Sequence, residues 1–295
     1  MTILLSVIYL LAGSVSASQD IFLKDGLTLR GDLVAEYDHE KWWWSQEKKV
    51  SYAILQEFPI TNIKIVDKAN IDFKKTKCLT VKRNLLEKYL SLKNIVLKRN
   101  PLNVTVYIAT ADDGHHKHED GYGDFALDLV VLGKDKWSYR NGGLKNEDFY
   151  IWNKKVFAPI DGTVSEVLKD EIDNDATLDY SVDVTPVFAE SNRVGIYLED
   201  NLYFYMLHFK QGSISKNLNV GDKIKVSDYL GRVGNSGVTY VPHLHTTLFF
   251  WDIGTARFWS IPINFKKASH KKIDELNWSS SQNFFPATGD EVRSF

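Results

Sequence analysis

Two histidines separated by one leucine, His243 and His245, open a segment whose composition favours an extended backbone. The residues that follow, 246–250, are β-branched, apolar or aromatic, as is typical of a strand. Residues i and i+2 of a strand point to the same face, so we expect both imidazoles to share one face. One imidazole can then bind a metal while the other contacts whatever the metal binds. Taken alone, the pair also fits two histidines that share a face by accident.

Length and charge restrict the class of protein. The chain has 295 residues and a formal net charge of -2, which suits one large or two modest domains with a substantial core. Near-neutral charge argues against a dedicated nucleic-acid binder, so we expect no nucleic-acid partner. Aromatic residues make up 13% of the chain, and they serve both in β-rich cores and in grooves for sugars or peptides. The only cysteine is Cys78, which excludes an intrachain disulfide.

The first 17 residues form an apolar run that ends in small side chains. Val15 and Ala17 suit cleavage after Ala17, as in a secretory signal peptide, although no Lys or Arg precedes the run. The run is also short for a membrane span. We therefore expect a signal peptide at residues 1–17, membrane contact only through this segment, and a secreted or periplasmic protein.

Residues 18–100 are expected to form a small β-rich module with one helix. Short alternating runs in residues 20–31 flank a Lys-Asp-Gly turn, which is a good hairpin signal. Three tryptophans at 42–44 fit either an exposed ligand platform or, as we prefer, the packing of a small sheet. Apolar residues at 79–94 are compatible with one amphipathic helix. The Asn-Pro-Leu-Asn sequence at 100–103 marks the boundary with a second domain, residues 101–295.

The second domain contains a polar loop with His115, His116 and His118, which leads into an apolar strand at 125–131. Asp128 lies in the middle of that strand. A carboxylate inside an apolar strand costs several kcal/mol unless it is paired or ligates a metal. The histidines of the preceding loop can serve as co-ligands, although a histidine-rich loop alone is usually just solvated.

Later segments continue the β pattern. Residues 156–167 have a strand–turn–strand pattern, and residues 193–198 and 202–208 fit a hairpin whose second strand ends at His208. A lone histidine in such a position is more often structural than functional. The stretch after residue 265 is polar and aromatic and is expected to pack on the domain as a C-terminal tail.

Four motifs of this domain occur in a fixed order. They are a histidine-containing loop before Phe125-Ala126-Leu127-Asp128, then residues 158–164 (Ala-Pro-Ile-Asp-Gly-Thr-Val), then Tyr205-Met206-Leu207-His208 before residues 212–214, and then the glycine-rich residues 231–237 before Pro242-His243-Leu244-His245. The set resembles the lysostaphin and LytM-type zinc metallopeptidases, which cut peptidoglycan peptides. The resemblance covers roughly residues 101–265, and the first hundred residues have no part in it.

The resemblance implies a mainly β protein, in which an antiparallel β-sheet zinc peptidase domain follows the small β-rich N-terminal module. By their places in the motifs, Asp128 and His245 are implied zinc ligands. The first ligand should be a histidine upstream of Asp128, but the gap to Asp128 is longer here than in the compact form of the motif. We choose His118 as the nearest candidate, with His116 as the runner-up and His115 as the third.

The same resemblance implies that His243 and His208 are the two non-ligand histidines beside the metal. Two imidazoles and one carboxylate suit zinc and leave a position open for water. Zinc lowers the pKa of that water toward about 7 and polarises the scissile carbonyl. The chain has no His-Glu-x-x-His motif to supply a glutamate base. His243 is placed to accept the proton of the water, and His208 to orient the water or donate to the oxyanion.

We therefore expect a secreted zinc-dependent endopeptidase that hydrolyses peptide bonds in peptidoglycan, either in cross-links or in stem peptides. The alternative is a catalytically silent binding or regulatory protein of the cell wall on the same fold. The presence of the metal-binding and catalytic residues favours an enzyme, although loops at 133–155 and 169–191 could cover the groove. A metal hydrolase with another substrate is a third hypothesis. The bond that is cut, the role of the N-terminal module and the oligomeric state stay open.

Overall fold

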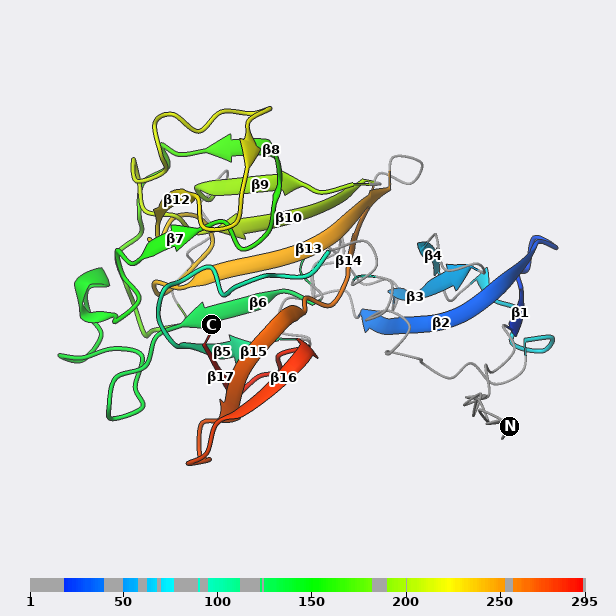
Figure 1. Ribbon diagram of the computed structural model, residues 1–295, viewed down its shortest axis with the longest axis horizontal. Coiled ribbons are helices and arrows are strands. Elements are labelled where there is room, and N and C mark those ends of the chain that lie inside the picture. Colours follow the sequence, from blue (N-terminus) through cyan, green and yellow to red (C-terminus); the bar gives the residue numbers. More distant parts are fainter. Residues whose placement is uncertain are drawn as a thin grey trace, which may run out of the picture.

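The computed structural model describes residues 19–39, 50–57, 63–67, 70–76, 90, 95–111, 123, 125–181, 190–199, 201–252 and 257–293. Strands account for nearly all of the regular structure in these residues, which confirms the predicted mainly β class (Figure 1). Several predicted features lie outside them: the signal segment at 1–17, the tryptophans at 42–44, the helix at 79–94 apart from Leu90, and the loop histidines His115, His116 and His118.

The N-terminal strands form a four-stranded antiparallel sheet in sequence order. Its members are β1 (Gln19–Phe22), β2 (Thr28–His39), β3 (Val50–Glu57) and β4 (Ile63–Asp67). The predicted hairpin is confirmed, because β1 pairs with β2 across a turn closed by the Leu23 amide and the Leu27 carbonyl, 2.8 Å apart. Gly26 has φ +90° in that turn, a backbone conformation that glycine adopts without a steric cost.

The second part of the chain forms an eleven-stranded sheet in which paired strands run antiparallel (Figure 1). Its order is β11-β8-β9-β10-β13-β6-β5-β17-β15-β16, with β14 paired to β13. The strands are β5 (Val106–Thr110), β6 (Leu127–Val130), β8 (Gly162–Leu168), β9 (Arg193–Tyr197), β10 (Leu202–Leu207), β11 (Lys223–Ile224), β13 (Leu244–Asp252), β14 (Arg257–Ser260), β15 (Phe265–Lys272), β16 (Ser279–Phe284) and β17 (Asp290–Arg293). A separate pair joins β7 (Lys155–Phe157) to β12 (Tyr229–Arg232).

The hairpin predicted at 193–208 shows why these residues form strands. β9 and β10 pair directly, and Leu202, Phe204 and Met206 are fully buried at alternate positions of β10. This period of two places the apolar side chains on the core face of the sheet. The predicted strand–turn–strand pattern at 156–167 is also present, as β7 followed by β8.

The stretch after residue 265 is not a tail. β15, β16 and β17 are strands of the large sheet, and β17 joins it by pairing with β5. Phe265, Ala268 and Val292 lie in the main core and are no more than 1% exposed. The polar composition misled the prediction because only one face of these strands is buried, as is usual in antiparallel sheets.

Two sets of buried apolar side chains accompany the two sheets. The core of the large sheet includes Leu90 and residues 95–97 but leaves out Ile21, Leu29 and Ile71, which are buried with the four-stranded sheet. Residues 95–97 are tied to the large sheet by the backbone, since the Leu97 amide donates to the Asn264 carbonyl at 2.9 Å.

Within the described part of the chain, we find no helix with the length and apolar character needed to cross a bilayer.

Candidate metal centre

The candidate site lies where three neighbouring strands of the large sheet meet. β13 begins at Leu244 between β6 and β10, and its second residue, His245, is paired with Asp128 of β6 and with Leu207 of β10. Directly paired residues of an antiparallel sheet place their side chains on the same face. The imidazole of His245 and the carboxylate of Asp128 are therefore neighbours because of the strand register, although 117 residues separate them.

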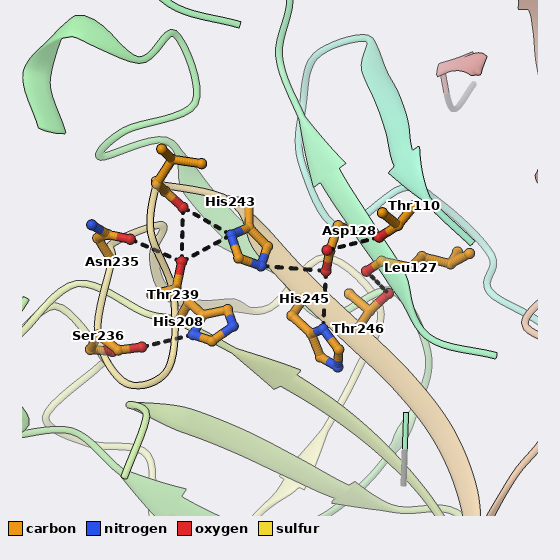
Figure 2. Close-up of polar contacts among 11 residues, drawn as sticks. Thr110, Leu127, Asp128, His208, Asn235, Ser236, Thr239, His243, His245 and Thr246 are labelled. Atoms are coloured by element: carbon orange, nitrogen blue, oxygen red, sulfur yellow. Dashed lines mark hydrogen bonds and ion pairs between the residues drawn. The ribbon is translucent and has the colours of Figure 1, made fainter. Parts of the chain in front are cut away.

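Asp128 is the centre of the polar contacts drawn in Figure 2. One carboxylate oxygen, Oδ1, lies 3.0 Å from Nδ1 of His245 and 3.3 Å from Nε2 of His243. The other, Oδ2, accepts a hydrogen bond of 2.8 Å from the hydroxyl of Thr110 on β5. Asp128 is only 8% exposed, so these contacts offset the cost of burying its charge.

His243 is oriented by the backbone just before it. Its Nδ1 lies 2.9 Å from the carbonyl oxygen of Val241 and 3.3 Å from the hydroxyl of Thr239. A carbonyl oxygen can only accept, so Nδ1 carries a proton, and Nε2, which faces Asp128, is the atom that gains a second proton and donates to the carboxylate when the ring is charged. Burial acts to lower the pKa of His243, but the charge and hydrogen bond of Asp128 outweigh it and raise that pKa above its usual range.

His208 directly follows β10 and has a backbone φ of +65°. Its ring lies beside those of His243 and His245. Its ring centroid lies 4.5 Å from that of His243 and 5.9 Å from that of His245. Nδ1 lies 2.7 Å from the carbonyl oxygen of Ser236, so this nitrogen carries the proton of the neutral ring (Figure 2). Burial, reinforced by the neighbouring His243 and His245, holds the pKa of His208 well below its usual range.

The donor set fits a zinc ion. Imidazole nitrogens and carboxylate oxygens are zinc ligands, and two ligands of one tetrahedral ion lie roughly 3.3 Å apart. The 3.0 Å between His245 Nδ1 and Asp128 Oδ1 is close to that separation. Among the described residues, the ligand atoms of His208, His243 and His245 also lie within 4.8 Å of one another. Asp128 and His245 would hold the ion together with a third ligand.

The structure brings together four of the five predicted site residues, namely Asp128, His208, His243 and His245. The fifth, His118, and its competitors His116 and His115 lie outside the described residues, so the choice of first ligand stays a prediction.

Sequence reasoning missed the groups that hold these side chains in place. They are the hydroxyls of Thr110 and Thr239 and the carbonyls of Ser236 and Val241. Thr110 is the last residue of β5, and its contact with Asp128 depends on the register between β5 and β6, which shifts between Ile108 and Thr110. No pattern along the chain reveals such a shift.

No protein-family model and no curated protein sequence matches this chain. Similar solved structures include a mutant catalytic domain of the prophage-encoded M23 protein EnpA from Enterococcus faecalis, 20% identical over 52% of this chain and 86% of that chain, with a TM-score of 0.31. The catalytic domain of the antimicrobial peptidase lysostaphin from Staphylococcus simulans is 14% identical over 58% of this chain and 92% of that chain, with a TM-score of 0.30. The M23 metalloprotease pseudoalterin, from the deep sea, is 14% identical over 68% and 95%, with a TM-score of 0.34.

These structures are of the M23 and lysostaphin type that the sequence motifs resemble. At such identities and TM-scores the similarities carry no argument about the activity of this chain.

Proposed function

We propose that this chain is a zinc-dependent endopeptidase that hydrolyses peptide bonds in peptidoglycan. One observation carries the proposal: a buried carboxylate, Asp128, meets His245 and His243 through a single oxygen, with the His208 ring beside them. Buried charged groups are typically paired with one another or coordinate a metal. The same arrangement is what a zinc peptidase site requires, with ligands and a base side by side.

The proposed ligands are Asp128, His245 and one histidine of the 115–118 loop, with His118 as our choice. When bound, zinc supplies a Lewis acid for the scissile carbonyl and lowers the pKa of a water toward about 7. The carboxylate of Asp128 is held for this role by Thr110, because its second oxygen is fixed by the hydroxyl.

His243 is the proposed general base. Its Nδ1 proton is committed to the Val241 carbonyl, so Nε2 is the atom that accepts the proton of the attacking water. The ring can then return this proton to the leaving amine.

His208 has the complementary role of orienting the water. Its lowered pKa keeps the ring neutral, and its Nδ1 proton is committed to the Ser236 carbonyl. The remaining nitrogen, Nε2, therefore accepts a hydrogen bond rather than donating one. Between the two roles that the sequence left open for His208, this arrangement favours orienting the water over donating to the oxyanion.

Peptidoglycan as the substrate, a secreted or periplasmic location and a signal peptide at 1–17 belong to the same proposal. So does a division into an N-terminal module and a peptidase domain, but with Leu90 and residues 95–97 counted with the peptidase domain and not with a module at 18–100, because they are buried in the core of the large sheet. The support is the order of the four motifs, together with the meeting of Asp128, His208, His243 and His245 at one place.

The test combines zinc content with digestion of purified peptidoglycan, using the chain from Ser18 onward and a shorter chain from Lys77 that keeps Leu90 and the residues buried with it. We expect about one zinc per chain, as in a single-metal peptidase site, and new peptide ends in the mass spectrum of the products. Activity in the shorter chain alone would make the N-terminal module an inhibitor. Zinc binding without cleavage by either chain would contradict the proposal and favour a silent wall-binding protein.

A further inference from the structure

The turn at residues 234–239, between β12 and β13, carries groups that orient both non-ligand histidines. The Ser236 carbonyl accepts the proton of His208 Nδ1, and the Thr239 hydroxyl lies 3.3 Å from Nδ1 of His243. Thr239 also donates from its buried hydroxyl toward the Val241 carbonyl, 2.9 Å away, which is the other partner of His243. The position of this turn therefore determines the orientation of the His208 and His243 rings.

The turn is fixed from outside by a two-residue strap, Asp173-Asn174, from the loop that follows β8. Asp173 forms an isolated β-bridge with Ser236, and its Oδ1 accepts a hydrogen bond of 2.7 Å from the backbone N–H of Asn235. Its second oxygen, Oδ2, accepts the Gln211 amide at 3.0 Å, just beyond His208. The strap thus joins the turn to the chain segment that carries His208.

Asn174 makes most of the contacts between the strap and the turn. Its amide donates to the Asn235 carbonyl at 2.9 Å, and its side-chain Nδ2 donates to the carbonyls of Gly237 at 2.6 Å and Thr239 at 3.1 Å. Its own carbonyl accepts from the side chains of Asn146 at 2.7 Å and Asn235 at 3.2 Å. Both N–H groups of the Asn174 carboxamide therefore donate hydrogen bonds to carbonyls of the same turn.

The turn packs closely against neighbouring segments at both of its glycines. A Cβ atom on Gly234 would lie 2.3 Å from the Lys210 backbone and 2.4 Å from the carboxylate of Asp173. A Cβ atom on Gly237, whose φ is +87°, would lie 2.4 Å from Cβ of Ser191. Because the turn is wedged between these segments, losing the strap displaces it as a unit rather than one side chain at a time.

We propose that Asn174 is a positioning residue that holds His208 and His243 in register with the Asp128–His245 pair. Asn174 does not touch the reacting atoms, and Asp128 and His245 are fixed independently by the register of β6 and β13. The kinetic part of this proposal rests on the proposed function, whereas the geometric part does not.

The test uses the full chain from Ser18 with Asn174→Ala and Asn174→Asp. The aspartate is isosteric with asparagine and retains the backbone contacts. It replaces the donating NH₂ group with an oxygen that faces the carbonyls of Gly237 and Thr239. This variant therefore tests the proposal even if the alanine variant fails to fold. Asn219→Ala is the matched control, because the Asn219 carboxamide also caps a loop carbonyl, that of Asn217 at 3.1 Å, in an exposed turn. Thermal unfolding establishes that each variant is folded.

The first readout is a long-range ¹H–¹⁵N correlation spectrum of the histidine rings in the metal-free protein, recorded as the pH is raised until the nitrogen shifts no longer change, so that both rings are neutral. His208→Gln and His243→Gln assign the two rings. In the wild type we expect both rings protonated at Nδ1. In the Asn174 variants we expect both to shift toward a mixture of tautomers, and the Asn219→Ala spectrum to match the wild type.

The second readout is zinc content with kcat and KM on peptidoglycan fragments. We expect unchanged zinc content and KM with kcat lowered about 10- to 100-fold, the cost of a small displacement of catalytic groups. A folded Asn174→Asp variant with wild-type ring spectra, or with wild-type kcat, would overturn the proposal, and so would a loss of zinc that accounts for the lost rate. If the wild type binds zinc but cleaves nothing, the proposed function fails, and the ring spectra alone decide the role of Asn174.

Discussion

At the scale of single residues, the histidines of the site differ in the ring nitrogen that contacts their neighbours. His245 points Nδ1 at Asp128, whereas Nδ1 of His243 and of His208 bonds to a backbone carbonyl, and Nε2 of His243 faces Asp128. A ring whose Nδ1 proton is fixed by a carbonyl has one defined basic atom. The three imidazoles are thus chemically distinct although they lie side by side.

Substitution of His243, just before β13, and of His245, within it, should separate metal binding from catalysis. We expect His245→Ala to lose zinc, because it removes a ligand. His243→Gln should keep zinc and lose about 10²- to 10⁴-fold in kcat, which is the usual contribution of a general base. Zinc content by mass spectrometry, together with kcat, distinguishes the two cases. Loss of zinc from His243→Gln would instead make His243 a ligand.

The first ligand can be identified by single substitutions in the histidine-rich loop. We expect His118→Ala to lower zinc affinity by several orders of magnitude, while His116→Ala and His115→Ala serve as controls and retain zinc. Competition with a chelator at fixed protein concentration measures these affinities. If His116→Ala releases zinc and His118→Ala retains it, the ligand is His116.

At the scale of secondary-structure elements, the turn between β7 and β8 is tied to two segments distant in sequence. Asp161 in this turn accepts from Lys98 Nζ at 2.7 Å and from the Val226 amide at 2.8 Å. These hydrogen bonds hold the pKa of Asp161 below its usual value of 3.8, and the bond from the Lys98 side chain contributes most. The carboxylate thereby links the residues that precede the large sheet to its edge near β11.

This link predicts a pH-dependent stability. A carboxyl whose folded-state pKa is lowered stabilises the fold above its unfolded pKa, and that contribution is lost as the pH falls through the folded pKa. We expect Asp161→Asn to lower the free energy of unfolding by roughly 1 kcal/mol at neutral pH, a value reduced by partial exposure. The difference from the wild type should shrink toward zero in urea unfolding at about pH 3 and below.

Asp274→Asn, at an exposed position, is the control for that experiment. It should change the free energy of unfolding less at neutral pH. A difference for Asp161→Asn that stays constant with pH would show that the lost hydrogen-bond geometry, and not the charge, is responsible.

At the scale of the whole molecule, the core of the large sheet is completed by residues that precede β5 and by the strands that follow the site residues in the sequence. This core includes Leu90, Ile95 and Leu97, which precede β5 in the sequence, and Phe265 and Val292, which follow the site residues. The carboxyl-terminal strands complete the sheet by pairing β17 with β5, which in turn supports β6 and Asp128. The candidate site around Asp128 therefore relies on residues far outside the motifs that contain its side chains.

Two shortened chains should differ in stability for this reason. A chain from Lys77 keeps Leu90, Ile95 and Leu97, whereas a chain from Pro101 exposes the core that they cover. Burial of one such side chain contributes about 1.5–3 kcal/mol, so we expect the Pro101 chain to be several kcal/mol less stable. Urea unfolding of both chains measures the difference. Equal stabilities would mean that residues 77–100 belong energetically to the N-terminal module.

The sequence by itself determined the β class and the hairpin at 193–208, and it singled out Asp128, His208, His243 and His245, whose side chains meet in the fold. These are local signals, since side-chain alternation and a carboxylate in an apolar strand are visible within a few residues. Only the tertiary structure decided that Thr110 and the strap at Asp173-Asn174 support the site, and that the carboxyl-terminal stretch forms strands of the sheet instead of a tail. Those features depend on register and on contacts between distant segments, and the chain pattern carries no record of which strands become neighbours.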